Sequence, residues 1–205
     1  MSVAHEEHQQ HEGHGGHENH EGHGGNKMAA SATLHCLTGC AIGEITGMVI
    51  GAGVGLGNAA TVPLSFGLAF VFGYSLSTLP VVRAGVAFLA ALTTVLAADT
   101  LSILTMEVVD NGVVLAIPGA LEAGLGNPLF WVSMAISLTA AFAAAFPVNK
   151  WLMARGKGHA KTHEYMHGGH EPEGWRRWVP DPAPTTLAAV IAAFLVGGLL
   201  ASLAG

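Results

Sequence analysis

Near its N-terminus the chain carries the stretch Leu34-His35-Cys36-Leu37-Thr38-Gly39-Cys40-Ala41-Ile42-Gly43-Glu44-Ile45-Thr46-Gly47-Met48, inside an apolar segment from about residue 30 to 56. This segment is long enough for a membrane-spanning helix, which needs about 20 residues. Side chains that can bind a metal or a proton recur there at every fourth position, namely Cys36, Cys40, Glu44 and Met48. On an α-helix this spacing places them on one face, along roughly 18 Å of its length. Because an ionisable group at bilayer depth costs on the order of 3 kcal/mol, Glu44 is expected to face protein, water or an ion.

The composition of the whole chain indicates an integral membrane protein. Of its 205 residues, 51% are hydrophobic and only 11% are charged, whereas soluble domains contain about 25% charged residues. Most charges lie in residues 1–27 and 150–181, and the body between them is rich in Gly and Ala. This segregation excludes an ordinary soluble fold. The sequence contains no basic patch, so nucleic acid is not an expected partner.

We therefore predict an all-α fold, an integral membrane bundle of about five transmembrane helices plus one short re-entrant or surface half-helix. The membrane domain covers residues 28–153, and a final transmembrane helix follows a loop at 154–181. The five spans are expected near residues 30–56, 60–79, 82–109 and 128–153 of the membrane domain, and at 182–205 after the loop. The half-helix is placed near 113–124, because Asn111-Gly112 is expected to end the third span and Pro118 to open a further turn of helix.

Residues 1–27 form a polar tail with a histidine at every third position: His5, His8, His11, His14, His17, His20 and His23. Such a segment cannot form a core, so we expect it to be disordered. Imidazole suits Zn, Cu and Ni, so the tail is expected to bind these metals with low affinity. It is either a capture arm for a metal or a polar extension whose metal binding is incidental.

A second group of histidines lies in the loop at 154–181. His159, His163 and His167 are four residues apart and would lie along one face of a short helix, as in paired zinc ligands. The alternative is a solvated amphipathic linker whose Lys and Arg side chains lie near lipid headgroups.

The main candidate metal site lies within the membrane. It comprises His35, Cys36, Cys40, Glu44 and Met48 of the first span, together with Asp99 of the third. Sulfur and imidazole ligands favour Cu(I) or Zn. The two cysteines are expected to be free thiols or metal ligands, not a disulfide. The alternative is that the Cys and Met side chains only fill the core.

The acidic residues of the third span suggest a polar path. If the first and third spans pack together, Glu44 and Asp99 would flank one polar cavity near the membrane midplane. Two neighbouring carboxylates would share a proton or a cation. Glu107 and Asp110 are instead expected to be solvated at the outer interface.

The distribution of basic residues predicts the orientation. Five spans with the N-terminus inside place every Lys and Arg of the chain on the cytoplasmic side, as the positive-inside rule requires. These residues are Lys27, Arg83, Lys150, Arg155, Lys157, Lys161, Arg176 and Arg177. The N-terminus is therefore predicted to be cytoplasmic and the C-terminus external.

Three strings within about residues 32–170 resemble a known family. They are the string from His35 to Glu44, the string Ala98-Asp99-Thr100-Leu101-Ser102 with Met106-Glu107, and the residues from Phe146-Pro147-Val148-Asn149 through Gly156-Lys157-Gly158-His159. The family is an uncharacterised one of bacterial membrane proteins, a domain of unknown function that is sometimes loosely labelled as a copper oxidase. The resemblance implies a multi-pass protein of the bacterial inner membrane, and it brings no assigned activity or ligands.

Together these features predict a membrane protein that handles or transports a transition-metal cation, namely copper, zinc or nickel, bound in divalent or cuprous form. One alternative is a non-transporting membrane subunit, scaffold or metal sensor. A second is a conductor of protons or alkali cations. The sequence contains no catalytic motif, so we do not expect an enzyme. The expected partners are the lipid bilayer, a metal ion, and either a second copy of the chain or another membrane protein.

Overall fold

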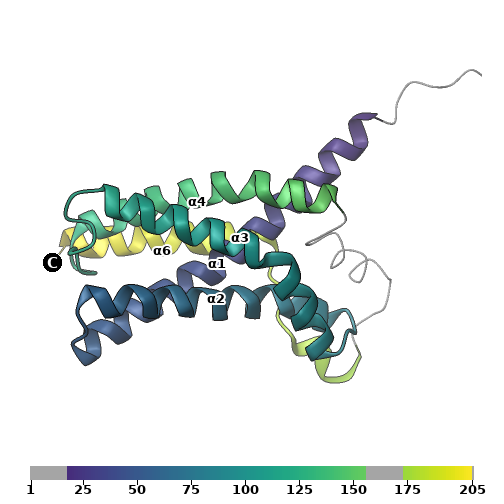
Figure 1. The fold of residues 1–205 in the computed structure, drawn as a ribbon, viewed down its shortest axis with the longest axis horizontal. Coiled ribbons are helices and arrows are strands. Elements are labelled where there is room, and N and C mark those ends of the chain that lie inside the picture. Colours follow the sequence, from purple (N-terminus) through teal and green to yellow (C-terminus); the bar gives the residue numbers. More distant parts are fainter. Residues whose placement is uncertain (1–17, 156–172, 205) are drawn as a thin grey trace, which may run out of the picture.

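A computed structural model describes residues 18–155 and 173–204 of the chain. The described part is a helical bundle without strands, which confirms the predicted all-α class (Figure 1). The elements are α1 (Glu18–Val54), α2 (Asn58–Arg83), α3 (Phe88–Ala116), α4 (Pro128–Ala154), the short 3-10 helix η1 (Gly174–Trp178) and α6 (Pro184–Ala204).

Four helices of the described part are each long and apolar enough to cross a membrane: Gly25–Val54 within α1, α2, α4 and α6. Helix α3 is bent by 54° between Phe88–Ala97 and Asp99–Ala116, and it counts as a fifth span if both segments belong to one crossing. The bundle therefore contains four to five membrane-spanning helices.

Helices α1 and α2 pack backbone against backbone. Four glycines of α1 recur at every fourth position and lie on small residues of α2, so that Gly39 faces Gly73, Gly43 faces Ala69, Gly47 faces Ser65 and Gly51 faces Thr61. A β-carbon on any of these four glycines would overlap the opposite helix. We call them the glycine stripe. Small residues drive helix association in membranes because they let the backbones approach closely.

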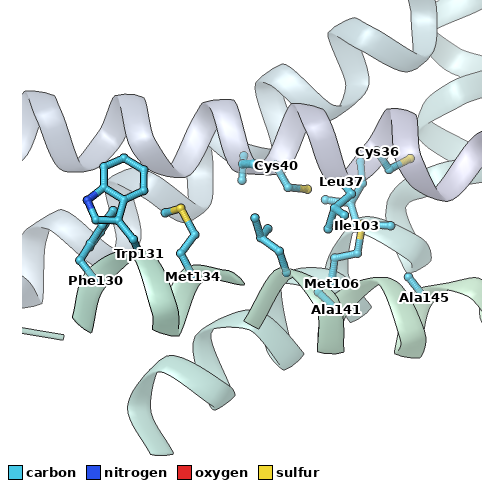
Figure 2. Close-up of a cluster of buried hydrophobic side chains, with 13 residues drawn as sticks. Cys36, Leu37, Cys40, Ile103, Met106, Phe130, Trp131, Met134, Ala141 and Ala145 are labelled. Atoms are coloured by element: carbon cyan, nitrogen blue, oxygen red, sulfur yellow. The ribbon is translucent and has the colours of Figure 1, made fainter. Parts of the chain in front are cut away.

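A neighbouring face of α1 packs against α3 and α4. Figure 2 shows Cys36 and Cys40 of α1 in one buried cluster with Ile103 and Met106 of α3 and Met134 of α4. The cysteines follow the same four-residue period as the glycine stripe, three positions earlier. One face of α1 therefore fits α2, while the face beside it supplies functional groups to the interior of the bundle.

Helix α6 covers the outside of this bundle. It packs against α4 and α1, where the ring of Trp131 fills the space beside Gly198. Leu187 is its only buried residue. Most of α6 is therefore available to lipid.

The basic residues of the described part lie at one end of the bundle. Lys27 lies near the beginning of α1, Arg83 ends α2, and the others belong to the end of α4 or to η1: Lys150, Arg155, Arg176 and Arg177. The Arg83 side chain donates a hydrogen bond of 2.7 Å from Nη1 to the carbonyl of Val179, which connects α2 to the segment after η1. The opposite end holds the α1–α2 turn and the loop at residues 117–127 (Figure 1).

Several helix boundaries differ from the predicted ones. Helix α1 begins at Glu18, so residues 18–27 of the tail predicted to be disordered are helical, and residues 1–17 lie outside the described part. Helix α2 continues through Pro80 to Arg83, although its end was expected near residue 79. Transmembrane helices tolerate proline because neighbouring helices and side chains satisfy the freed backbone groups. The third helix consequently begins at Phe88 rather than near residue 82.

The prediction of a half-helix at 113–124 differs from the structure. Asn111 does not end α3, because its side-chain amide donates a 2.9 Å hydrogen bond to the Glu107 carbonyl and the helix continues to Ala116. Residues 117–127 form turns. Pro118 and Gly119 occupy the centre of a β-turn in which Gly119 has a φ of 79°, a combination typical of a type II turn. A positive φ at this position cannot continue a helix.

The glycine stripe leads to a stability prediction. Replacing Gly43 with Ala places a methyl group on the backbone of Ala69, so we expect the free energy of unfolding to fall by about 1–3 kcal/mol. The matched control is Gly67→Ala in α2, where a β-carbon meets no atom within 4 Å. Helix propensity should leave this control unchanged or more stable by up to about 1 kcal/mol. Thermal unfolding in detergent measures both variants, and equal stability would contradict the proposed packing role of the stripe.

Candidate intramembrane polar site

Acidic and thiol side chains follow the interface between α1 and α3 in three successive groups. We call this arrangement the polar line. It is formed by Cys36, Cys40 and Glu44 of α1 and by Asp99, Glu107 and Asp110 of α3, and all six are buried. Such groups are expensive in a bilayer and mark functional sites in membrane proteins.

The first group joins three helices near the bend of α3. The Cys36 thiol donates to Oδ2 of Asp99 at 3.7 Å, and its sulfur lies 3.4 Å from the hydroxyl oxygen of Ser77 in α2. Asp99 begins the second straight segment of α3. The structure thus brings together Cys36 and Asp99, two of the predicted site residues.

The second group consists of Cys40 and Glu107. The Glu107 side chain is completely buried, at 0% exposure, and lies beside the Cys40 thiol. Within the described residues neither of its carboxyl oxygens has a hydrogen-bond partner of good geometry. Almost all buried polar groups in proteins have such a partner, so this carboxyl group requires a functional or chemical explanation.

The third group is a pair of carboxyl groups. Glu44 and Asp110 lie within hydrogen-bonding range of each other, and the Ser137 side chain of α4 lies beside Asp110. The Ser137 hydroxyl itself donates to the Met134 carbonyl at 3.1 Å. Oδ1 of Asp110 is buried without a partner in the described part of the chain. Two carboxyl groups so close together share a proton or bind a cation, because two bare charges would repel each other.

A cavity of about 260 Å³ adjoins the third group. Glu44 and Asp110 lie at its inner end, and its walls come from α1 to α4 and from the loop at 117–127. It therefore lies at the end of the bundle opposite the basic residues. The polar line continues from this cavity toward the basic end, through Glu107 and Cys40 to Asp99 and Cys36.

The partner of Glu44 differs from the sequence-based expectation. Glu44 lines the cavity together with Asp110, and Asp99 does not line it. The charged neighbours of Glu44 are Asp110 and Glu107. The expectation that Glu107 and Asp110 are solvated was wrong, since their side chains are only 0% and 6% exposed. The four-three-four spacing of Asp99, Ile103, Met106 and Asp110 already places these residues on one face of a helix. Glu107 belongs to the same side, because it is four residues after Ile103 and three before Asp110.

A comparison with known proteins identifies the family. The sequence profile described as "Domain of unknown function (DUF4396)" matches residues 26–158. The chain belongs to the DUF4396 family. This match confirms the expected resemblance to an uncharacterised family. The chain matches no curated protein and no solved structure.

The DUF4396 match covers α1 from residue 26 onward and the whole of α2, α3 and α4. Every residue of the polar line and every wall of the cavity therefore lies inside the family domain. Helix α6 lies outside it. The polar site of this chain thus lies within its DUF4396 domain.

The remaining predicted metal ligands are not assembled with the polar line into one site. His35 is buried, and its Nδ1 lies 2.9 Å from the Ser31 carbonyl; if Nδ1 donates there, Nε2 carries a lone pair without a partner. Met48 is half-buried at the wall of the cavity. Cys36 and Cys40 are free thiols, as expected. Among the described residues, no three His, Cys, Asp or Glu side chains are arranged to hold a metal ion.

The other predicted ligands lie outside the described residues or at the very beginning of α1. His159, His163 and His167 lie outside the described residues, as do His5, His8, His11, His14 and His17. His20 and His23 belong to the first turns of α1. Their roles as metal ligands stay predictions.

The unpartnered carboxyl group of Glu107 leads to a second prediction about stability. Replacing Glu107 with Met removes a buried polar group and keeps a similar volume, so we expect the free energy of unfolding to rise by about 1–3 kcal/mol. The measurement is thermal unfolding in detergent.

The control is Asn149→Leu. The Asn149 amide donates a 2.8 Å hydrogen bond to Oγ1 of Thr33, so its loss should lower stability by about 1–3 kcal/mol. Loss of stability in Glu107→Met would mean that Glu107 supports the fold, contrary to a functional role.

Proposed function

We propose that this DUF4396 protein moves a cation across the bacterial inner membrane along the polar line, and that the cargo is copper, zinc or nickel. The observation that carries the proposal is Glu107, which is completely buried beside the Cys40 thiol and has no hydrogen-bond partner of good geometry for either carboxyl oxygen within the described part. A carboxyl group in this state needs a cation or a proton, since burying a bare charge is too expensive.

The chemistry of the polar line supports a transition metal as cargo. Thiol sulfur selects soft cations such as Cu(I) and Zn, and carboxylates supply charge along the same path. Each of the three groups of the polar line contributes only two potential metal ligands, for example the Cys36 thiol and the Asp99 carboxylate. Conduction requires several weak sites rather than one tight site, because the ion must also leave.

The ends of the line suggest a direction for capture. The basic end of the bundle is proposed to be cytoplasmic, since cytoplasmic loops are rich in Lys and Arg. The histidine segments at residues 5–23 and 159–167 would then capture or release metal on that side, and His35 with Cys36 would receive it. The cavity next to Glu44 would face the exterior.

A proton or alkali cation is a second candidate for the cargo. It is favoured by the Glu44–Asp110 pair, which can share a proton. A second observation also favours it. Among the described residues, no three His, Cys, Asp or Glu side chains lie close enough together to form a metal site. In this case the two cysteines would serve only for packing.

Metal flux into proteoliposomes tests the proposal. With an indicator dye inside and Zn²⁺ or Cu⁺ outside, we expect Glu107→Gln to lower the initial flux at least about tenfold, which corresponds to a barrier raised by about 1.4 kcal/mol. The matched control is Glu173→Gln, an exposed glutamate at the basic end, which should retain the original flux. Deletion of residues 1–17 should retain flux at saturating metal.

Two outcomes would contradict metal transport. Absence of any metal flux in the original protein would favour a scaffold or sensor. Proton flux that is unchanged in the Cys36→Ser/Cys40→Ser double variant, without metal flux, would favour the second candidate.

The proposed orientation yields a separate prediction. A fluorescent protein fused to the N-terminus should fluoresce in the cytoplasm, and alkaline phosphatase fused after Gly205 should be active in the periplasm. The reason is that five spans with the basic end inside place the two termini on opposite sides. An inactive phosphatase together with a fluorescent C-terminal fusion would contradict this arrangement.

A further inference from the structure

The cavity combines a charged inner end with apolar walls. Its wall surface is mainly apolar and includes Leu56, Val62, Val114, Leu121, Phe130 and Met134. Polar side chains also line it, namely Asn58, Thr61, Ser65, Asn111, Glu122 and Ser133. At the inner end lie two buried acidic side chains, Glu44 and Asp110, with Ser137 beside them, whereas the third acidic residue of the lining, Glu122, is exposed on the loop at 117–127. The cavity is therefore amphipathic, with two buried carboxyl groups at one end and a mainly apolar wall around the rest.

The charge at the inner end favours a cation. Asp110 is 6% exposed, lines the cavity, and has a buried Oδ1 without a partner among the described residues. No Lys or Arg belongs to the described lining. If Glu44 and Asp110 share one proton, a single negative charge remains, and a single positive charge would balance it.

The size and walls of the cavity favour an organic cation over a metal ion. A volume of about 260 Å³ far exceeds the roughly 10–15 Å³ that one water needs, and it falls just below the roughly 300–1,000 Å³ of pockets for drug-sized ligands. Hard metal ions require oxygen ligands or retained water on all sides, which a mainly apolar wall does not supply. A small cation with an apolar body matches both parts of the cavity.

We propose that this cavity binds a small monovalent organic cation, a primary ammonium group on an apolar body. The ammonium group donates hydrogen bonds to Glu44 and to the unpartnered Oδ1 of Asp110. The apolar body lies against Val114 and Phe130. This inference does not depend on metal transport, because it concerns the cavity and not the thiols of the polar line.

Isothermal titration calorimetry of the full chain in lipid nanodiscs tests the inference. The probe is n-butylammonium, and n-butanol is its neutral counterpart of the same length. We expect saturable binding of one n-butylammonium per chain and no saturable binding of n-butanol, with heats corrected by empty nanodiscs.

Two pairs of variants test the position of the site. Asp110→Asn should weaken n-butylammonium binding at least about tenfold, since it replaces a charged hydrogen-bond acceptor of the ammonium group with a neutral one. Its control is Asp181→Asn, an exposed aspartate at the opposite end. Val114→Phe should fill the cavity and abolish binding, whereas Val108→Phe, on the same helix and 61% exposed, should not.

Several results would overturn the inference. They are the absence of saturable n-butylammonium binding, equal binding of n-butanol, binding unaffected by Val114→Phe, or saturation of the site by K⁺ or Zn²⁺ while n-butylammonium fails to bind. If Asp110→Asn does not fold, the Val114→Phe and Val108→Phe pair decides the question alone. Metal flux can fail while n-butylammonium binds, so the two proposals are tested separately.

Discussion

The contact between the glycine stripe of α1 and the small residues of α2 determines how the other helices are placed. Inside a membrane there is no hydrophobic force between helices, so close packing has to supply the association energy. Each glycine of the stripe removes a β-carbon that would overlap α2. Once this face is occupied by α2, the neighbouring face with Cys36, Cys40 and Glu44 is directed toward α3 and α4. The position of the polar line is therefore a consequence of the α1–α2 contact.

The polar line is costly for the fold. Buried ionisable groups in the bilayer cost on the order of 3 kcal/mol each on insertion scales, and the bundle contains four buried carboxyl groups: Glu44, Asp99, Glu107 and Asp110. Asp99 accepts from a thiol, and Glu44 with Asp110 forms a pair. Glu107 lies beside the Cys40 thiol, but among the described residues neither of its carboxyl oxygens has a hydrogen-bond partner of good geometry. Unsatisfied polar groups of this kind persist where function requires them, because an apolar side chain would give a more stable bundle.

Most of the fold was predictable because the length and hydrophobicity of a membrane span are properties of a local segment. The spans near α1, α2, α4 and α6 follow directly from apolar runs. The errors occurred at Pro80 and Asn111, where rules for helix ends in water were applied to helices within a membrane. There the bilayer forces the backbone to keep its internal hydrogen bonds, and the helix continues past residues that would end it in water. Helix α3 ends at Ala116 and does not resume in the turn at Pro118 and Gly119, where Gly119 has a positive φ.

The sequence by itself determined that the chain is a bundle of membrane helices, that its basic residues lie at one end, and that Glu44 cannot face lipid. Periodicity also placed Cys36, Cys40 and Glu44 on one face of α1. Only the tertiary structure decided which carboxyl groups meet: Asp99 lies with Cys36, whereas Glu44 lies with Asp110, and Glu107 is buried rather than solvated. The physical reason is that periodicity specifies the face of a single helix. The axial register of two packed helices depends on how their side chains fit together. The periodicity of one helix carries no information about this register.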